Sequence, residues 1–212
     1  MKTPYNHADK ALKVLNDTMG REFQNMSVSL RFDELNVIEV KKQVGAMYTR
    51  INRVVKRQFG KVAQKVFEDT EKELGVAHTE FASGKFVLAL FKRYDPVTKY
   101  VYTSEWARKR DRLVESIMAS DGRRELRQAL KRALDLMALQ VRQYADNLTD
   151  ETRHEVFEMA GVDEVKWNTQ HDGKVCGECA DRDGMIYPID AVPDKHYRCR
   201  CYLTAVHRRG AT

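Results

Sequence analysis

The chain has 212 residues and a formal net charge of +6, with 42% hydrophobic and 32% charged residues. This balance is typical of a globular protein with a buried core, and it argues against a disordered or collagen-like chain. The longest uninterrupted apolar run spans residues 86–91, far short of the roughly 20 residues that cross a bilayer. No apolar segment at the start has the length that a secretory signal requires. We therefore expect a protein made in the cytosol, without a membrane partner.

Positive charge is concentrated in the central part of the chain. Between residues 38 and 66, eight Lys and Arg residues stand against a single acid, Glu39. Residues 143–212 instead carry 9 basic and 13 acidic residues, a balance of −4. Together with the hydrophobic pattern, this asymmetry predicts a basic helical body over residues 1–160 and a C-terminal Cys/His module over residues 161–212.

Apolar residues recur at alternating steps of four and three, which predicts long amphipathic helices. One series predicts a helix over about residues 35–74, ended by Gly75. Other series predict a shorter helix over residues 106–118 and a long helix over residues 126–148. A last short helix is expected from about residue 149 to residue 161. The fold class is therefore mainly α, with the helices packed as a bundle.

Aromatic and β-branched residues on both sides of Asp95-Pro96 predict a hairpin, or a corner between a helix and a strand. Several aromatic residues here alternate with basic ones, a mixture that fits either stacking on nucleic-acid bases or an ordinary core. These aromatic residues are Tyr94, Tyr100, Tyr102 and Trp106. Residues 1–7 and 207–212 are predicted to be loosely held termini.

All four cysteines lie close together near the end of the chain. Cys176 and Cys179 have two residues between them, and Cys199 and Cys201 follow with one residue between them. Two thiolates in a Cys-x2-Cys turn can hold one tetrahedral metal ion. The ligand set would be completed by Cys199 together with either Cys201 or His196. Zinc would also stabilise a segment that has few large apolar residues.

The C-terminal module is predicted to contain a two-stranded β-ribbon, pinned by zinc or by disulfides. Residues 185–188 would pair with residues 202–206, and the last two cysteines would point to one face of a strand. Disulfides formed outside the cell and unpaired thiols are the alternatives to zinc. A catalytic cysteine with His196 or His171 as its base is disfavoured, because a closed four-ligand site leaves no open coordination position.

The spacing of the C-terminal residues is similar to that of a known family. The residues that carry the similarity are Trp167, Thr169, Asp172, Cys176, Cys179, Asp183-Gly184, Tyr187, Pro193, His196 and Cys199-Arg200-Cys201. In this order they resemble the C-terminal module of phage head morphogenesis proteins, the minor capsid proteins similar to the Mu F protein. The resemblance covers about 40 residues, and the chain departs from the family pattern at Tyr197, where proline is common.

The resemblance implies a noncatalytic minor head protein, present in few copies inside the virion head and in the host cytoplasm during assembly. Its implied partners are the portal, other head proteins and the packaged genome. Neither an enzymatic activity nor a small-molecule substrate is implied. A DNA-binding zinc protein of regulatory or architectural type is the alternative function.

Two groups of basic residues are candidates for sequence-independent contact with double-stranded DNA. The first follows one helix face at steps of four and comprises Arg53, Arg57, Lys61 and Lys65. The second begins the later long helix and comprises Arg123, Arg124, Arg127 and Lys131. Like charges four residues apart cost about 0.2–0.5 kcal/mol per pair, and DNA phosphates would relieve this repulsion. Two alternatives to DNA contact also account for these two groups of basic residues. They could form a solvated surface, or they could face acidic residues of a neighbouring subunit.

Overall fold

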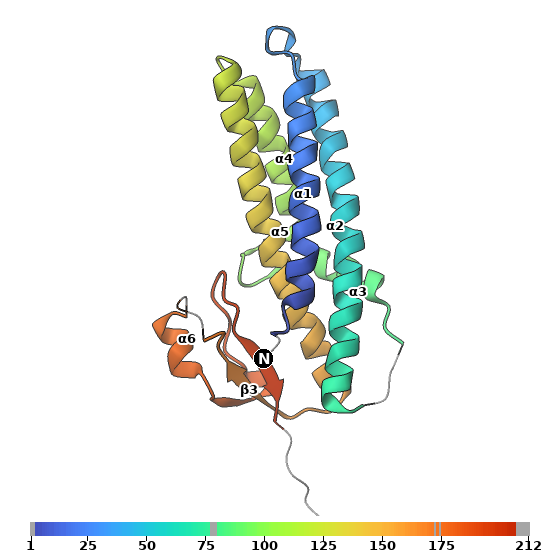
Figure 1. The fold of residues 1–212 in the computed structure, drawn as a ribbon, viewed down its shortest axis with the longest axis vertical. Helices are drawn as coiled ribbons and strands as arrows, with labels where there is room; N and C mark the ends of the chain where they lie inside the picture. The colour runs from blue at the N-terminus through green and yellow to red at the C-terminus, as the bar shows by residue number, and fades with distance from the viewer. Residues whose placement is uncertain (1–2, 77–79, 172, 174, 207–212) are drawn as a thin grey trace, which may run out of the picture.

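The structure is a computed structural model that describes residues 3–76, 80–171, 173 and 175–206. It shows a mainly helical protein with small antiparallel sheets, as predicted (Figure 1). The helices are α1 (Asn6–Ser29), α2 (Val37–Leu74), α3 (Ser83–Lys92), α4 (Tyr102–Met118), α5 (Arg123–Met159) and α6 (Gly177–Arg182). The strands are β1 (Tyr94–Asp95), β2 (Tyr100–Val101), β3 (Glu164–Asn168), β4 (Ile186–Pro188) and β5 (Tyr202–Ala205). Within the described residues, no helix is both long and apolar enough to cross a membrane.

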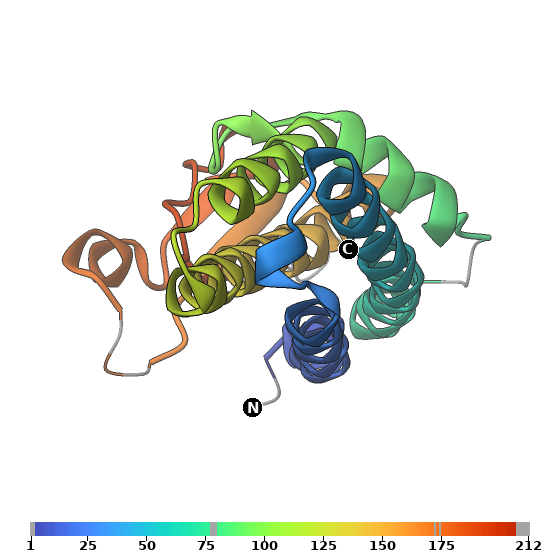
Figure 2. The same cartoon turned by 90° about the horizontal axis from the view of Figure 1, so that it is seen from above.

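Four long helices, α1, α2, α4 and α5, lie side by side along the long axis of the molecule (Figure 1). Seen from above, α5 lies between α1 and α4, and α2 contacts all three (Figure 2). Their apolar faces meet in one core, where Leu15, Ile51, Ile117 and Val141 have no solvent exposure. The bundle therefore forms because each helix has one apolar face to bury.

The caps of α2 agree with the predicted helix over residues 35–74. The side chain of Asn36 accepts hydrogen bonds from the backbone N–H groups of Ile38 and Glu39, at 2.8 and 3.4 Å. At the other end Gly75 adopts a left-handed conformation with φ of 69°, which glycine reaches without steric cost. Gly75 thus ends the helix, as predicted.

The separate short helix predicted from residue 149 is wrong, because α5 continues without a break to Met159. The hydroxyl groups of Thr149 and Thr152 donate to the carbonyl oxygens of Ala145 and Leu148, one helical turn back. Both threonines are fully buried, so they extend the core-facing side of α5. The acidic residues near this point, which resemble a helix start, lie inside a continuing helix.

The N-terminal segment is held more firmly than predicted, since Tyr5 is fully buried and α1 begins at Asn6. The Tyr5 hydroxyl lies 2.8 Å from a carboxylate oxygen of Asp150 and 2.8 Å from the carbonyl oxygen of Cys201. These contacts join the start of the chain to α5 and to the C-terminal module. The other predicted loose end, residues 207–212, lies outside the described residues.

The segment around Asp95 forms the predicted hairpin, with β1 antiparallel to β2 directly after α3. The Asp95 carboxylate accepts hydrogen bonds from the Val97 N–H at 2.9 Å and the Thr98 hydroxyl at 2.7 Å. Two of the aromatic residues here, Tyr102 and Trp106, are buried in the core, where their rings stack. They are therefore not free to stack on nucleic-acid bases.

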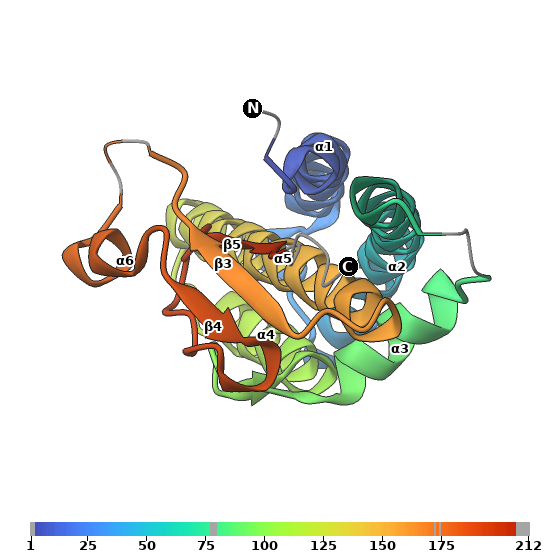
Figure 3. The same ribbon diagram turned by 90° about the horizontal axis from the view of Figure 1, so that it is seen from below.

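The C-terminal module contains a three-stranded sheet with the order β4-β3-β5, so the predicted two-stranded ribbon is wrong. The central strand β3 pairs antiparallel with both neighbours, and the sheet lies beneath the lower end of α5 (Figure 3). Along β3 the buried side chains of Val165 and Trp167 alternate with the exposed Lys166. This period of two is visible in the sequence and was the signal for a third strand.

Candidate metal centre

Cys176 and Cys179 are presented by the first turn of α6. Cys176 is the N-cap residue, and its carbonyl oxygen accepts the backbone N–H of Ala180 at 2.9 Å. Cys179 follows three residues later, and residues three apart at a helix start lie on the same side. The short helix thus directs both sulfur atoms toward one point.

The second half of the cluster is built by a tight turn from His196 to Cys199. The backbone N–H of Cys199 donates to the carbonyl oxygen of His196 at 3.0 Å, and Arg198 within the turn has a φ of 64°. The Arg198 N–H donates to the side chain of Gln143 on α5 at 2.9 Å, which fixes the turn against the bundle. Cys199 and Cys201 precede β5 and lie outside the strand, contrary to the expectation that they belong to one.

The structure brings all five predicted residues into one cluster. His196 Nε2 lies 3.3 Å from Cys176 Sγ and 3.1 Å from Cys179 Sγ, and Cys179 Sγ lies 3.7 Å from Cys199 Sγ. The ligand atoms form two groups, Cys176 with Cys179 and His196, and Cys179 with Cys199 and Cys201. Within each group the atoms lie within 4.8 Å of one another, and Cys179 belongs to both.

One of these distances matches an edge of a small coordination tetrahedron, whereas Cys199 and Cys201 fall in a different group from Cys176 and His196. Sulfur ligands at about 2.3 Å from a tetrahedral ion lie about 3.8 Å from one another, close to the separation of Cys179 and Cys199. All four cysteines are free thiols in the structure, so the disulfide-pinned alternative is not what it shows. The sulfur and nitrogen donors of the cluster could hold a metal ion.

The histidine is oriented as metal-ligating histidines usually are. His196 Nδ1 lies 2.9 Å from the carbonyl oxygen of Tyr197. A carbonyl oxygen can only accept, so Nδ1 carries the proton and Nε2 presents its lone pair to the sulfur atoms. The same backbone contact is the main reason why the pKa of His196 is raised.

The sulfur atoms differ in how readily they ionise. Hydrogen bonding from the Cys201 thiol lowers the pKa of Cys199 to about 5, and the backbone N–H of Cys179 lowers the pKa of Cys176. Burial raises the pKa of Cys179 to about 12, and the hydrogen bond with Cys199 raises the pKa of Cys201. A divalent cation would favour thiolates at all the sulfur atoms that it contacts.

A small apolar cluster shields one side of the centre. The sulfur atoms of Cys179, Cys199 and Cys201 pack with the fully buried Trp167. Cys176 and His196 are exposed to solvent, which leaves a path by which an ion can enter. The remaining apolar residues at this cluster are Val175, Tyr187, Val192 and Leu203.

Ion pairs connect the centre to α1 and α5. Arg200, between the last two cysteines, lies 3.0 Å from the carboxylate of Asp9 and 3.7 Å from that of Asp146. Lys195 lies 2.7 Å from the carboxylate of Asp150. The chain segments that carry the candidate ligands are therefore held by charges on the bundle.

His171 does not join the cluster, because its Nε2 faces the carboxylate of Asp183 at 3.6 Å. The predicted DNA-contacting residues all lie exposed on α2 and α5. Three of them are paired with acids: Lys65 with Glu68, Arg123 with Asp33, and Lys131 with Asp135. The other five have no ion-pair partner within the described part of the chain: Arg53, Arg57, Lys61, Arg124 and Arg127.

Comparison with known proteins identifies part of the chain. Residues 108–204 match the model of the family described as Phage Mu protein F like protein. Neither curated proteins nor solved structures gave a match. The matched span begins in α4, contains all of α5 and ends in β5, so it includes every candidate ligand. The resemblance read from the C-terminal motif is thereby confirmed, and residues 108–204 are similar to the Phage Mu protein F like family.

Proposed function

We propose that the protein is a noncatalytic minor head protein of a phage, which acts in head morphogenesis and remains in the virion. The family match over residues 108–204 carries this proposal. The cysteine and histidine cluster supports a structural role, because its donor atoms lie close to one another around a cavity of only about 100 Å³. The portal and other head proteins are its proposed partners.

We test this function by mass spectrometry of phage particles purified through a density gradient. The protein should be present in the particles in few copies and should resist removal by washing. Its recovery only from the host cytoplasm would contradict a virion role and favour the alternative, a regulatory or architectural DNA-binding protein.

In this proposal the C-terminal module binds one zinc ion through Cys176, Cys179, Cys199 and His196. His196 is preferred over Cys201 as the fourth ligand, because its Nε2 lies within 3.3 Å of two sulfur atoms and its Nδ1–H is already anchored. Cys201 would then serve as a hydrogen-bond donor to Cys199. Bound zinc would supply folding energy to the module.

Elemental analysis of protein purified without chelator tests the zinc site, with about one zinc per chain expected. His196→Ala should weaken zinc binding at least tenfold in competition with a chelator, whereas Cys201→Ser should keep the stoichiometry. The reverse outcome would make Cys201 the fourth ligand. Zinc-free protein with disulfide bonds would contradict a metal site.

The proposed contact with packaged DNA uses the exposed basic residues of α2 and α5. Arg53, Arg57 and Lys61 form a row on α2 without an ion-pair partner among the residues that the structure describes. Each phosphate that such a row contacts releases counterions. Replacing these three by Gln should weaken binding to a DNA duplex and reduce the salt slope by about 2–3. The matched control replaces Lys10, Lys13 and Arg21 on α1 by Gln. Equal losses in both variants would contradict a specific role for the row.

A further inference from the structure

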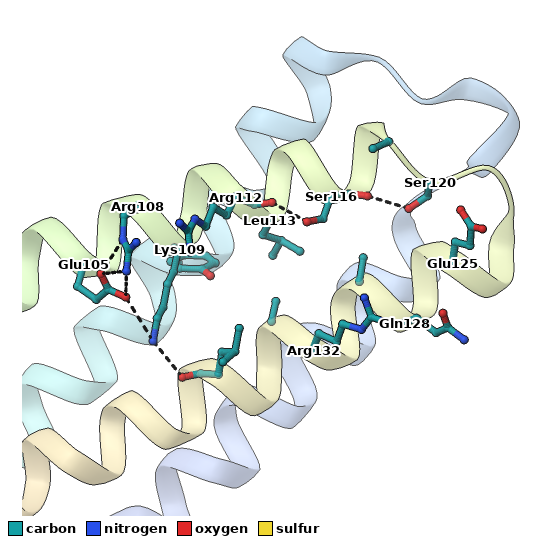
Figure 4. A pocket seen from close by; sticks show the side chains of 15 residues that line it. Glu105, Arg108, Lys109, Arg112, Leu113, Ser116, Ser120, Glu125, Gln128 and Arg132 are labelled. Atoms are coloured by element: carbon teal, nitrogen blue, oxygen red, sulfur yellow. Dashed lines mark hydrogen bonds and ion pairs between the residues drawn. The ribbon is translucent and has the colours of Figure 1, made fainter. Parts of the chain in front are cut away.

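A groove of about 670 Å³ opens between α4 and α5, toward the end of the bundle opposite the C-terminal module (Figures 1 and 4). This volume lies within the range of about 300–1,000 Å³ that is usual for binding sites. The groove belongs neither to the metal centre nor to the basic row on α2. It arises because the facing surface of α5 carries small residues, Ala129 and Ala133, where a bundle helix usually presents large ones.

The two banks of the groove are straight rows of side chains. Residues on α4 recur at steps of four, namely Arg108, Arg112 and Ser116, and Ser120 continues the row just after the helix ends. Residues on α5 recur at the same step, namely Gln128, Arg132 and Leu136. Leu113 points into the space between the rows (Figure 4). Ala129 and Ala133 also line the groove and complete its apolar floor. Rows at steps of four with a gap between them are the surface into which a further helix packs.

Each bank carries an arginine without an acidic partner. Neither Arg112 on α4 nor Arg132 on α5 has an ion pair or side-chain hydrogen bond within the described part of the chain. Nearby basic residues do have acidic partners, since Arg108 pairs with Glu105 and Lys131 pairs with Asp135. The groove therefore has two free positive charges, one on each side of an apolar floor.

A third cation, Lys109, also lines the groove, and its side chain is mostly buried. Lys109 Nζ lies 3.7 Å from the Glu105 carboxylate and donates to the carbonyl oxygen of Leu136 at 3.2 Å. Burial lowers the pKa of Lys109, and the neighbouring charges of Arg108 and Arg112 lower it further. An anionic group entering beside Arg112 would reduce this repulsion.

Apolar surface continues beyond the groove along α5. Leu136 is 53% exposed and Leu139 is 38% exposed, although both lie on a helix with a well-defined buried face. Exposed leucines next to a groove are typical of protein contacts. DNA phosphates would gain no contact from this apolar surface, because the side chains of leucine and alanine offer neither a hydrogen-bond donor nor a charge.

We propose that the groove between α4 and α5 binds an acidic amphipathic helix of another protein. Apolar side chains of that helix would cover Leu113, Ala129 and Ala133, and its Asp or Glu residues would face Arg112 and Arg132. Charge complementarity selects this occupant, since each bank carries an arginine without an acidic partner and the surface between them is apolar. Of the two acids that line the groove, Glu105 is paired with Arg108 and Lys109, and Glu125 accepts the backbone N–H of Asp121. The inference depends on neither zinc nor DNA binding.

A synthetic helix serves as the probe. A fluorescein-labelled peptide of about 20 residues, with leucines in heptad spacing and glutamates beside them, is long enough to form a helix. Its binding to the full chain is measured by fluorescence anisotropy. A second peptide has lysine at every glutamate position. We expect the glutamate peptide to bind and the lysine peptide to bind at least tenfold more weakly.

Variants then locate the binding. The double substitution Arg112→Glu with Arg132→Glu should weaken binding of the glutamate peptide at least tenfold and strengthen binding of the lysine peptide. The reason is that it reverses the sign of the charge on both banks. Lys13→Glu with Arg21→Glu on α1 changes the net charge equally and should alter binding less than twofold. Ala133→Trp should fill the floor and weaken both peptides. Circular dichroism verifies that each variant is folded. If the double variant with Glu at positions 112 and 132 does not fold, the double variant with Arg112→Gln and Arg132→Gln is used in its place.

Three results would overturn the proposal. One is an equal loss of the glutamate peptide in the groove and α1 variants, which would show attraction to net charge alone. Another is undiminished binding after the charge reversal. The third is a DNA duplex that needs Arg112 and Arg132 while the glutamate peptide does not bind, which would make the groove a phosphate site.

Discussion

Tyr5→Phe tests whether the start of the chain holds the C-terminal module in place. The Tyr5 hydroxyl lies 2.8 Å from both the Asp150 carboxylate and the Cys201 carbonyl oxygen, and Lys195 Nζ lies 3.3 Å from it. Burial raises the pKa of Tyr5 well above its ordinary value, so the hydroxyl stays protonated and remains a donor. The substitution removes this one oxygen and keeps the ring, which is fully buried.

The expected loss follows from what remains after the hydroxyl is gone. A hydrogen bond to a charged group contributes about 1.5–3 kcal/mol. Lys195 still contacts both Asp150 and the Cys201 carbonyl oxygen, so neither acceptor is left alone in the interior. Because the ring is unchanged, the cavity left by the substitution is at most the size of one oxygen atom. We therefore expect the free energy of unfolding to fall by about 2 kcal/mol.

Urea denaturation followed by circular dichroism measures this loss. For a chain of this size the slope is about 2 kcal/mol per molar urea, so the midpoint should fall by about 1 M. Tyr94→Phe is the matched control, because the Tyr94 side chain is 54% exposed and its loss should cost less than about 0.5 kcal/mol. If the urea midpoint of Tyr5→Phe equals that of Tyr94→Phe, the hydrogen bonds of the Tyr5 hydroxyl do not contribute to stability and the reasoning is refuted.

Other predictions concern pH and backbone conformation. Burial raises the pKa of Asp146 to about 7, with Arg200 opposing the shift. The folded chain thus keeps a proton that the unfolded chain releases near pH 4, so the free energy of unfolding falls between about pH 4 and about pH 7. Asp146→Asn should gain stability relative to wild type as the pH rises from about 4 to about 7, and urea midpoints that run parallel for the two proteins would contradict this. Gly75→Ala should cost about 1 kcal/mol because of its φ of 69°. Gly60→Ala, inside α2 with open space around it, should instead add about 0.5–1 kcal/mol, and thermal unfolding that moves both variants in one direction would refute the distinction.

The helices could be predicted where apolar residues recur at regular spacing and where the sequence carries a clear signal for the end of the helix. The α2 helix combines both signals, since its apolar face repeats over many turns and Gly75 ends it. The junction at Thr149 failed because a threonine followed by acidic residues resembles a helix N-terminus. Only burial shows that Thr149 and Thr152 bond to the preceding turn. Propensity is a weak guide wherever packing decides the outcome.

The cysteine and histidine residues of the candidate site could be named from spacing alone, but their supports could not. Cys176 and Cys179 are neighbours because only two residues separate them along the chain, so their proximity could be predicted from the sequence. The meeting of Cys179 with Cys199 depends instead on β3, which separates β4 from β5 and sets the distance between the two halves. Contacts such as Arg200 with Asp9 join residues 191 positions apart, and no local pattern indicates them.

The same long-range contacts show that the Mu F-like region is not self-sufficient in this protein. Residues 108–204 include Arg153, which is 6% exposed and donates to Glu73 on α2 at 2.8 and 3.1 Å and to the Leu203 carbonyl oxygen at 3.0 Å. Without the N-terminal residues, Arg153 would lose Glu73 and keep the Leu203 carbonyl oxygen, and the half-buried Asp150 would lose Tyr5 and keep Lys195. Each lost hydrogen bond would cost about 1–3 kcal/mol. The N-terminal helices also supply much of the core that covers α5. The N-terminal helices are therefore part of what positions the cysteine and histidine cluster, although the family match lies wholly outside them.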